Sequence, residues 1–420
     1  MFDVSRKFDF FVTIYLLCFK LEKDIMNLTT LVERIKFGGF MMKRVIAIVL
    51  TIMLMSMMLV GCNTAPKVAE SEIILITDKG NIDDKSFNQG SWEGVVEFAT
   101  ANNKTHTYIK PEEVSDAGYL AAIDLAVKAK AKVIVTPGFL FEVAIYEAQT
   151  KYPDVKFILL DGVPHTADWT TFETKENVAS ILYAEEQSAY LAGYAAVIDG
   201  FTNLGFMGGM AVPAVQAFGY GFLQGAEDAA VELGLADGAV KVTYHYTGNF
   251  DENDTNKATA RTMYQEGVEV IFAAGGSVGK SVMSAAAEAD AKVIGVDVDQ
   301  RYDSETVITS AMKGLGTSVI DVLDSIFNTD SFDTYGGKST YFNAANDGVG
   351  LPTVVLGEAD GDAFDRFNTF NKAKYDEVFA KVADGSISVI RSITVADATG
   401  YATADELTSQ LGLAKVSVIT

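Results

Sequence analysis

The sequence predicts an α/β protein of two doubly wound lobes, each a parallel β-sheet with helices on both faces. Two observations support this prediction. From residue 71 onward, short apolar segments alternate with longer segments of helical spacing, which is the order of βαβ units. Most of the short segments are apolar at every position, as strands covered on both faces should be. Eight or more such units are more than we expect in a single open sheet, which favours two lobes. A TIM barrel is the alternative, because it also contains eight strands in about 250 residues.

Several of the predicted strands end at turn signals such as Pro137-Gly138 and Gly208-Gly209. In chain order, the predicted strands are 73–77, 133–136, 157–160, 203–207, 240–246, 270–273, 293–296 and 307–310. Helices are predicted between them, for example over 115–130, where Leu120, Ile123 and Val127 fall on one face. A second clear helical pattern runs over 139–152.

No long linker separates the two lobes, so we expect the chain to pass between them more than once. The first crossing is expected near 184–187 and a return near 299–305. The first lobe would then comprise residues 71–184 and about 305–330, and the second lobe residues 185–304 and about 331–420. Ligands of such folds bind at the carboxyl ends of parallel strands, so the residues that follow each strand are the candidates for a site.

The N-terminal region differs from the rest of the chain. Residues 41–61 begin with a basic segment and continue as an uncharged apolar stretch, which is short for a bilayer-spanning helix of about 20 residues and suits a secretory signal peptide. The end of this stretch, Leu59-Val60-Gly61-Cys62, is similar to a bacterial lipobox, which implies lipidation of Cys62 and a tether over 62–70. A plain transmembrane anchor is the alternative. Residues 1–40 are then a doubtful upstream extension, and we expect translation to begin at Met41 or Met42.

The composition argues against several classes of protein. The 420 residues include 33 Lys or Arg and 56 Asp or Glu, and the net charge of −23 would repel a phosphate backbone, so nucleic acid is not an expected partner. The two cysteines, Cys18 and Cys62, cannot form a disulfide framework. With three histidines and no cysteine pair at zinc spacing, we expect no metal site and no cofactor.

The polar segment after the first strand predicts contact with a ligand. Asp78 lies at the strand end, where a side chain points into the cleft, and Asp84 or Ser86 can cap the helix that follows. Phe87 is a large apolar side chain in a polar loop, where it has little core to join. An aromatic face beside a carboxylate and the amide of Asn88 suits a small polar ligand that carries a ring.

Similar residues follow the other predicted strands. They are Asp161, Phe250, Asp251, Gly275, Gly276, Asp297, Asp299 and Lys313. For any one of them, a cap, a turn or a solvated charge is an equally good explanation. Their convergence at successive strand ends is the stronger observation, and it predicts a binding cleft.

Part of the chain resembles a known family at this point. The run Ile82-Asp83-Asp84-Lys85-Ser86-Phe87-Asn88-Gln89-Gly90 and its flanks, from Ile76 to Gly94, look like the signature of the basic membrane protein family, the PnrA-like purine-nucleoside-binding lipoproteins. Further collinear matches are Val135–Phe139, Tyr183–Gly193, Gly205–Gly209 and Gly295–Gln300. The similarity covers roughly Glu72 to Pro352 and includes the lipobox.

The resemblance implies a type I periplasmic-binding-protein fold, whose lobes close over a purine nucleoside. It also implies delivery of that ligand to an ABC permease in the membrane, and attachment of the protein to the outer side of the bacterial cell membrane through Cys62. No bond would be made or broken.

The resemblance also implies roles for individual residues. Phe87 and Phe250 would stack on the two faces of the base. Asp78 and Asn88 would form hydrogen bonds with the edges of the base. Asp297 and Lys313 would contact the ribose hydroxyls, and Gly275 and Gly276 would approach the ligand through their backbone.

Other functions compete with this interpretation. The stretch Ala274–Ser281 fits a relaxed P-loop between a strand and a helix, but a glycine-rich turn explains it equally, and an exported lipoprotein meets little ATP. A nucleoside hydrolase is a further alternative, with His165 near Asp161 as a base and its orienting partner, but no serine or cysteine nucleophile is indicated beside them. A binding protein for a sugar or a signalling ligand is a third. We expect a binding protein and not an enzyme.

Overall fold

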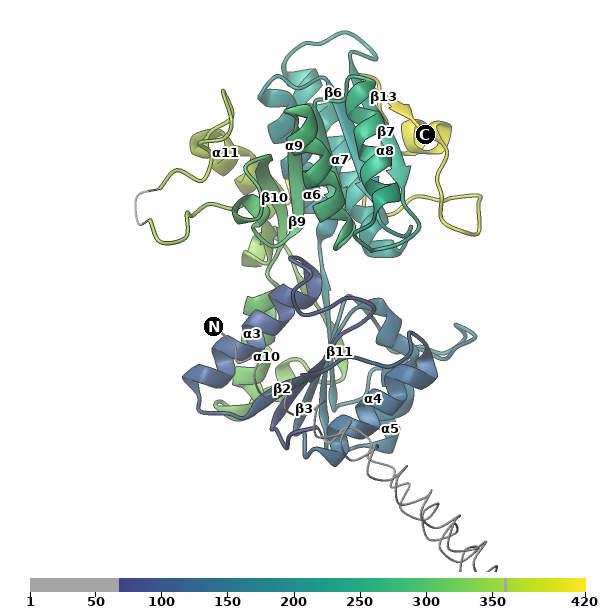
Figure 1. The fold of residues 1–420 in the computed structure, drawn as a ribbon, viewed down its shortest axis with the longest axis vertical. Coiled ribbons are helices and arrows are strands. Elements are labelled where there is room, and N and C mark those ends of the chain that lie inside the picture. The colour runs from purple at the N-terminus through teal and green to yellow at the C-terminus, as the bar shows by residue number, and fades with distance from the viewer. Residues whose placement is uncertain (1–67, 359–360) are drawn as a thin grey trace, which may run out of the picture. The chain divides into compact units, whose positions relative to one another are not determined.

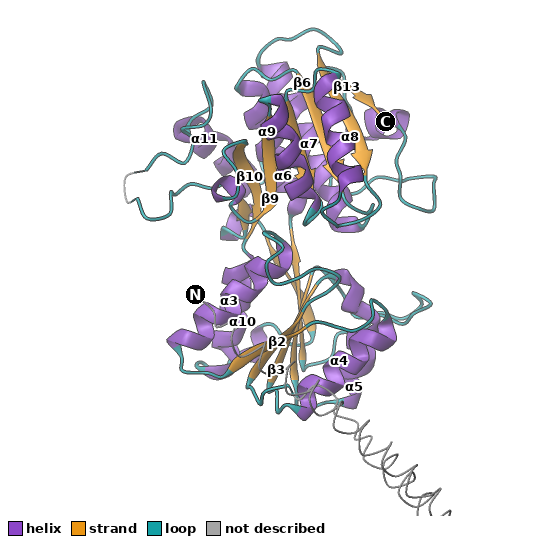
Figure 2. Cartoon of the chain, viewed as in Figure 1, coloured by secondary structure: helices purple, strands orange, loops and turns teal. Residues whose placement is uncertain are grey.

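The computed structural model describes residues 68–358 and 361–420, which contain two β-sheets with helices on both faces of each (Figure 1 and Figure 2). The predicted α/β class with two doubly wound, parallel-sheet lobes is therefore confirmed. A TIM barrel is excluded for the described residues, because their strands form two separate sheets and not one closed ring.

The first lobe is built on a sheet with the strand order β11-β5-β4-β3-β1-β2, and each neighbouring pair in it is parallel. Its strands are β1 (Ile73–Ile76), β2 (His106–Ile109), β3 (Val133–Pro137), β4 (Lys156–Leu160), β5 (Val178–Tyr183) and β11 (Lys338–Phe342). Helices α4 (Asp116–Lys128) and α5 (Glu142–Lys151) cover one face, and α3 (Phe87–Ala101) and α10 (Leu315–Phe327) cover the other. The central strands are apolar throughout because both faces of the sheet are buried.

The second lobe has a sheet with the order β12-β10-β9-β8-β6-β7-β13, in which β12 is antiparallel to β10 and the other pairs are parallel. Its strands are β6 (Asn203–Gly208), β7 (Val240–Tyr246), β8 (Val270–Ala274), β9 (Lys292–Asp297), β10 (Val307–Lys313), β12 (Val349–Gly350) and β13 (Val416–Ile419). Helices α6 (Glu185–Ile198) and α7 (Pro213–Glu232) pack on one face, and α8 (Asp254–Gln265) and α9 (Val278–Ala289) on the other.

The C-terminal segment wraps around the second lobe and contains α11 (Lys372–Ala383) and α12 (Ala404–Leu411). Two buried carboxylates hold it. Asp199 accepts hydrogen bonds from the backbone N–H groups of residues 368–370, and Glu227 accepts them from those of residues 414–416. These bonds satisfy backbone donors that would otherwise be unpaired, and they fix the course of the segment that carries Arg391.

The eight strands predicted from the sequence overlap β1, β3, β4, β6, β7, β8, β9 and β10. Sequence analysis missed the other five. Of these, β2 and β13 lie at the open edges of their sheets, β12 has two residues, and β11 (KSTYF) has three polar residues in five. Edge strands need only one buried face and carry a weaker apolar signal. The fifth missed strand, β5 (Val178–Tyr183), is internal and buried, so this reason does not apply to it.

The predicted lobe boundaries need a correction at two of the three crossings. The first crossing joins Tyr183, the last residue of β5, to Glu185, the first of α6. We expected a return at 299–305 and assigned 305–330 to the first lobe, but β10 pairs with β9 in the second sheet, so the return follows Lys313. We also assigned 331–420 to the second lobe, yet β11 pairs with β5 in the first sheet, and the third crossing follows Phe342. Strand pairing decides lobe membership, and the sequence does not show which runs pair.

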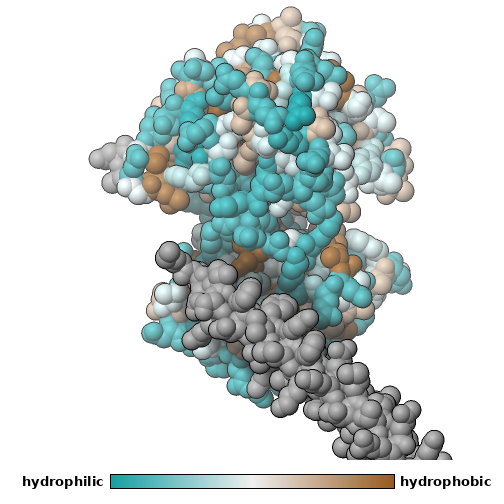
Figure 3. All heavy atoms as spheres, in the orientation of Figure 1, coloured by the Kyte–Doolittle hydropathy of each residue, from teal (hydrophilic) through white to brown (hydrophobic). Residues whose placement is uncertain are grey.

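The predicted upstream extension (1–40), signal peptide (41–61) and lipidation site Cys62 lie outside the described residues, as does most of the predicted tether. Among residues 68–358 and 361–420, each helix is too short or too polar to cross a bilayer. The face of the second lobe seen in Figure 3 is largely hydrophilic.

Candidate functional site

A cavity of about 350 Å³ is lined by residues of both lobes. Its size lies within the roughly 300–1,000 Å³ typical of small-molecule sites. All nine residues predicted for ligand contact line it: Asp78, Phe87, Asn88, Asp161, Phe250, Gly275, Gly276, Asp297 and Lys313. They come together because each lies at or after the carboxyl end of a parallel strand or begins the helix after it, and these ends face the same space. Their contacts with a ligand stay a prediction.

The first-lobe side of the cavity is organised by two aspartates around Asn88. Asp84 caps helix α3, since its carboxylate accepts hydrogen bonds from the backbone N–H groups of Ser86, Asn88 and Gln89. The side-chain amide of Asn88 donates to Asp78 Oδ1 at 2.8 Å and to Asp84 Oδ2 at 2.9 Å, and its oxygen accepts from the backbone N–H of Asp78. Asn88 therefore holds the carboxylate of Asp78 in place and has its own donors engaged.

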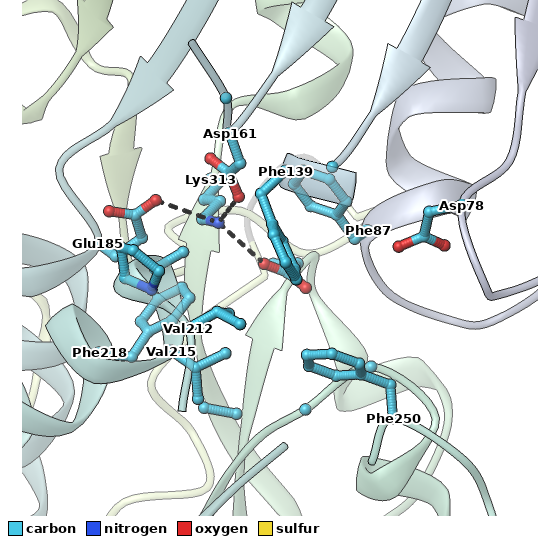
Figure 4. A pocket seen from close by; sticks show the side chains of 18 of the residues that line it. Asp78, Phe87, Phe139, Asp161, Glu185, Val212, Val215, Phe218, Phe250 and Lys313 are labelled. Carbon is cyan, nitrogen blue, oxygen red and sulfur yellow. Dashed lines mark hydrogen bonds and ion pairs between the residues drawn. The ribbon is translucent and has the colours of Figure 1, made fainter. Parts of the chain in front are cut away.

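The second feature of the cavity is an ion-pair cluster around Lys313, drawn with dashed lines in Figure 4. The ammonium is 2.5 Å from Asp161 Oδ2, 3.3 Å from Glu185 Oε1 and 3.8 Å from Asp297 Oδ1. The side chain of Lys313 is 2% exposed and that of Glu185 is 1% exposed. Because three carboxylates surround one ammonium, the cluster carries an excess of negative charge.

The burial of this cluster shifts its pKa values. Burial raises the pKa of Asp161 to about 7 despite the attraction of Lys313, and burial likewise raises the pKa of Asp297. Burial opposes the charge of Lys313, but the attraction of its three carboxylates outweighs it, so the pKa of Lys313 is raised as well. Burial also raises the pKa of Asp78. The side-chain oxygen Asp161 Oδ1 is buried and has no hydrogen-bond partner among the described residues, so it is an acceptor available to a ligand.

Two of these aspartates have a strained backbone. Asp161 (φ 54°) and Asp297 (φ 66°) both lie in the left-handed region, directly after β4 and at the last position of β9. Non-glycine residues adopt this region at a cost, and such residues cluster at functional sites. The left-handed conformation turns the chain away from the sheet and leaves both carboxylates at the cavity.

Aromatic side chains enter the cavity from both lobes. Phe87 begins α3 in the first lobe, and Phe250 follows β7 in the second (Figure 4). The ring of Phe250 packs directly on Gly209, where any Cβ would overlap ring carbons. The Lys313 ammonium lies 4.9 Å from the centre of the Phe87 ring, which places this ring beside the ion-pair cluster. A third ring, that of Phe139, also lines the cavity and is drawn next to Phe87 in Figure 4.

Sequence analysis missed several residues that line the cavity. Besides Phe139, they include Glu142, Glu185, Phe218 and Arg391. The guanidinium of Arg391 contacts Glu185 Oε2 at 2.5 Å and Glu186 Oε2 at 2.6 Å, and it donates to the backbone oxygen of Tyr183. Phe139 follows the predicted strand 133–136 and could have been found by the same rule as Asp161, whereas Glu185 follows β5, a strand that was not predicted. Arg391 lies in a segment without regular structure, far along the chain, and no local signal marks it.

The features that suggested enzymes have other roles in the structure. Lys280, the lysine of the P-loop-like stretch, donates to the backbone oxygen of Asp83 in the first lobe at 3.1 Å. The partner of His165 is Glu142 and not the expected Asp161, since its Nε2 is 3.1 Å from Glu142 Oε2 and its Nδ1 is 2.8 Å from the backbone oxygen of Thr166. Within the described residues, no group of three or more His, Cys, Asp or Glu side chains is arranged to hold a metal ion.

Comparisons with known proteins agree with this architecture. A family model described as "ABC transporter substrate-binding protein PnrA-like" matches residues 71–394. The chain is 31% identical over 379 residues to the ABC transporter nucleoside-binding protein BmpA of Lactococcus lactis. The aligned region covers 83% of this chain and 99% of that protein. It is 29% identical to basic membrane protein D of Borreliella burgdorferi, over 81% of this chain and 92% of that protein.

Among solved structures, an ABC transporter solute-binding protein from Aeropyrum pernix superimposes with a TM-score of 0.67 at 23% identity, over 81% of this chain and 99% of the other. A solute-binding protein from Conexibacter woesei superimposes with a TM-score of 0.57 at 20% identity, over 76% of this chain and 98% of that one. These likenesses confirm the predicted type I periplasmic-binding-protein fold.

Proposed function

Since the chain belongs to the PnrA-like family of ABC-transporter substrate-binding proteins, we propose that it captures a nucleoside with a purine base, such as guanosine, inosine or adenosine. The ligand would be held between the two lobes and released to an ABC permease. The name of the Lactococcus lactis relative, a nucleoside-binding protein, supports the ligand class.

The observation that carries the proposal is the pair of phenyl rings, Phe87 and Phe250, which reach one cavity from separate lobes. Stacking of a base on an aromatic side chain contributes about 1–3 kcal/mol, so two rings could supply a large part of the roughly 8 kcal/mol that a micromolar affinity requires. A ligand that contacts both lobes at once also favours their closure, because only differential affinity shifts such an equilibrium.

The ion-pair cluster around Lys313 offers hydrogen-bond partners for the sugar of the proposed nucleoside. Asp161 Oδ1 is an acceptor without a partner among residues 68–358 and 361–420, and Asp297 Oδ1 is 3.8 Å from the Lys313 ammonium that Asp161 Oδ2 also contacts. Vicinal hydroxyl groups are donors that match these two carboxylates. Because Asp297 Oδ2 already accepts from Ser86 Oγ, the oxygen that a missing ribose hydroxyl would leave unpaired is Asp161 Oδ1. Lys313 in turn can donate to a hydroxyl oxygen.

The charge of the cavity favours an uncharged ligand. Its lining includes the carboxylates of Asp78, Asp84, Glu142, Asp161, Glu185 and Asp297, against the cations of Lys79, Lys313 and Arg391. A phosphate group would meet this excess of negative charge with little water to screen it. Nucleosides should therefore bind more tightly than their monophosphates.

We propose further that the protein acts outside the cytoplasm, attached to the cell membrane through a lipid on Cys62, and that it makes or breaks no bond. Membership of a family of substrate-binding proteins supports both statements. Labelling with a radioactive fatty acid should mark the wild-type chain and not a Cys62→Ser variant. Incubation with inosine should release no free hypoxanthine, whereas release would show a hydrolase.

Isothermal titration with guanosine, inosine, adenosine, GMP, ribose and glucose tests the ligand. Guanosine or another purine nucleoside should bind most tightly, and Phe87→Ala or Phe250→Ala should each weaken binding by about 5- to 150-fold. Phe172→Ala is the matched control, because Phe172 is an exposed first-lobe phenylalanine outside the cavity lining. Tighter binding of glucose or GMP, or equal effects of all three variants, would contradict the proposal.

A further inference from the structure

A short first-lobe segment, residues 83–86, contacts the second lobe at the cavity, where Ser86 Oγ donates to Asp297 Oδ2 at 2.5 Å, and also at points outside the cavity. The Lys280 ammonium donates to the backbone oxygen of Asp83 at 3.1 Å. The side-chain amide of Gln300 donates to the backbone oxygen of Lys85 at 2.6 Å, and the Lys85 ammonium is 3.2 Å from Asp303 Oδ1. The cavity lining includes none of Asp83, Lys85, Lys280, Gln300 and Asp303. These contacts therefore join the lobes without use of the site.

Each side of this junction is also held by contacts within its own lobe. Gln300 is 1% exposed; its side-chain oxygen accepts from the backbone N–H of Val296, and its own N–H donates to Ser310 Oγ, both at 3.0 Å. On the first-lobe side, Lys85 has a left-handed backbone (φ 64°), and its N–H donates to Gln89 Oε1. That strained conformation presents both the carbonyl and the ammonium of Lys85 to the second lobe.

We infer that Lys280, Gln300 and Asp303 form a latch for the first-lobe segment 83–86, and that this latch sets how long a captured ligand stays bound. The inference rests on the proposed function, since it takes ligand release to require separation of the lobes. The three residues are positioning residues. They act through segment 83–86, which leads directly into Phe87 and Asn88 at the start of helix α3.

The physical reason is that contacts made only when the lobes are together stabilise that arrangement, whether or not a ligand is present. Dissociation requires these contacts to break, whereas the first encounter of ligand with an open cleft does not involve them. The latch should thus slow dissociation and leave association nearly unchanged. It also gives the P-loop-like lysine a role without any nucleotide.

Stopped-flow kinetics with guanosine test the latch in the full-length chain. The double variant Lys280→Met/Asp303→Asn removes two partly exposed contacts, and we expect guanosine to dissociate about three- to tenfold faster, with the association rate within about twofold of wild type. The single variant Lys280→Arg keeps a donor at this position, so guanosine should stay bound to it nearly as long as to the wild type. Lys257→Met is the matched control, because Lys257 pairs with Glu288 at 2.6 Å within the second lobe.

An unchanged dissociation rate in the double variant, or an equal acceleration in the control, would overturn the inference. A second measurement separates it from the proposed function. Spin labels at Glu147→Cys and Glu266→Cys, exposed sites on the first and second lobes, report the distance between lobes without ligand when Cys18 and Cys62 are replaced by serine. The double variant should show a larger share of long distances even if no nucleoside binds. Identical distance distributions would refute the latch.

Discussion

Replacement of Lys313 by methionine should destabilise the protein in a way that depends on pH. The side chain of Lys313 is 2% exposed and neutralises carboxylates at 2.5, 3.3 and 3.8 Å. Methionine keeps much of the apolar stem but removes the cation, and breaking a buried ion pair from one side costs about 3–5 kcal/mol because the partner charge is left uncompensated. We expect a loss of this size in the free energy of unfolding at pH 8.

The sign of the pH dependence follows from Asp161. Its pKa in the folded wild type is raised to about 7, so its charged form already costs stability, and that cost appears as the pH rises towards 7. Removal of the Lys313 charge raises the folded-state pKa further. Asp161 then stays protonated to a higher pH in the folded variant, and the difference in stability between wild type and variant grows above pH 7. Below about pH 6 the carboxyl group is neutral in both, and the difference should be smaller and nearly constant.

Urea unfolding followed by circular dichroism at pH 5.5 and pH 8 measures both values. Lys257→Met removes a surface ion pair and should change the free energy of unfolding by less than about 1 kcal/mol at either pH. A Lys313→Met deficit that is no larger at pH 8 than at pH 5.5, or one below about 1 kcal/mol at pH 8, would refute the assignment of Lys313 as the cation that neutralises a buried carboxylate cluster.

Three further outcomes are expected. Guanosine should bind more weakly as the pH falls below about 7, because protonation of Asp161 removes an acceptor for ligand hydroxyls; affinity that is constant from pH 5 to pH 8 would argue against that contact. Gly209→Ala should lower guanosine affinity in titration calorimetry by displacing the aromatic ring that packs on it, whereas Gly279→Ala, whose added methyl makes only ordinary contacts at 3.8 Å, should not. Trp169 lines the cavity rim and is 63% exposed, so guanosine should change the intrinsic fluorescence of wild type and of Trp92→Phe but not of Trp169→Phe; a signal that survives in Trp169→Phe would place the ligand elsewhere.

Much of the site could be predicted because it follows a local rule. In a parallel sheet the residues after each strand gather at one edge, so Asp78, Asp161 and Asp297 could be found from apolar runs alone. The family resemblance then suggested the two phenylalanines and the roles of the residues. Phe139 also follows a predicted strand and could have been found by this rule, whereas Glu185 follows β5, which the apolar runs did not reveal.

The sequence by itself determined the alternation of strands and helices, the doubly wound class and the residues at most strand ends, because these depend on contacts between near neighbours and on burial of both sheet faces. Only the tertiary structure decided which strands pair, where the chain crosses between lobes, and which charges meet. Lys313 pairs with Asp161 across 152 residues, and Arg391 reaches Glu186 across 205. Such partners are chosen by the packing of whole lobes, and no local pattern of residues encodes them.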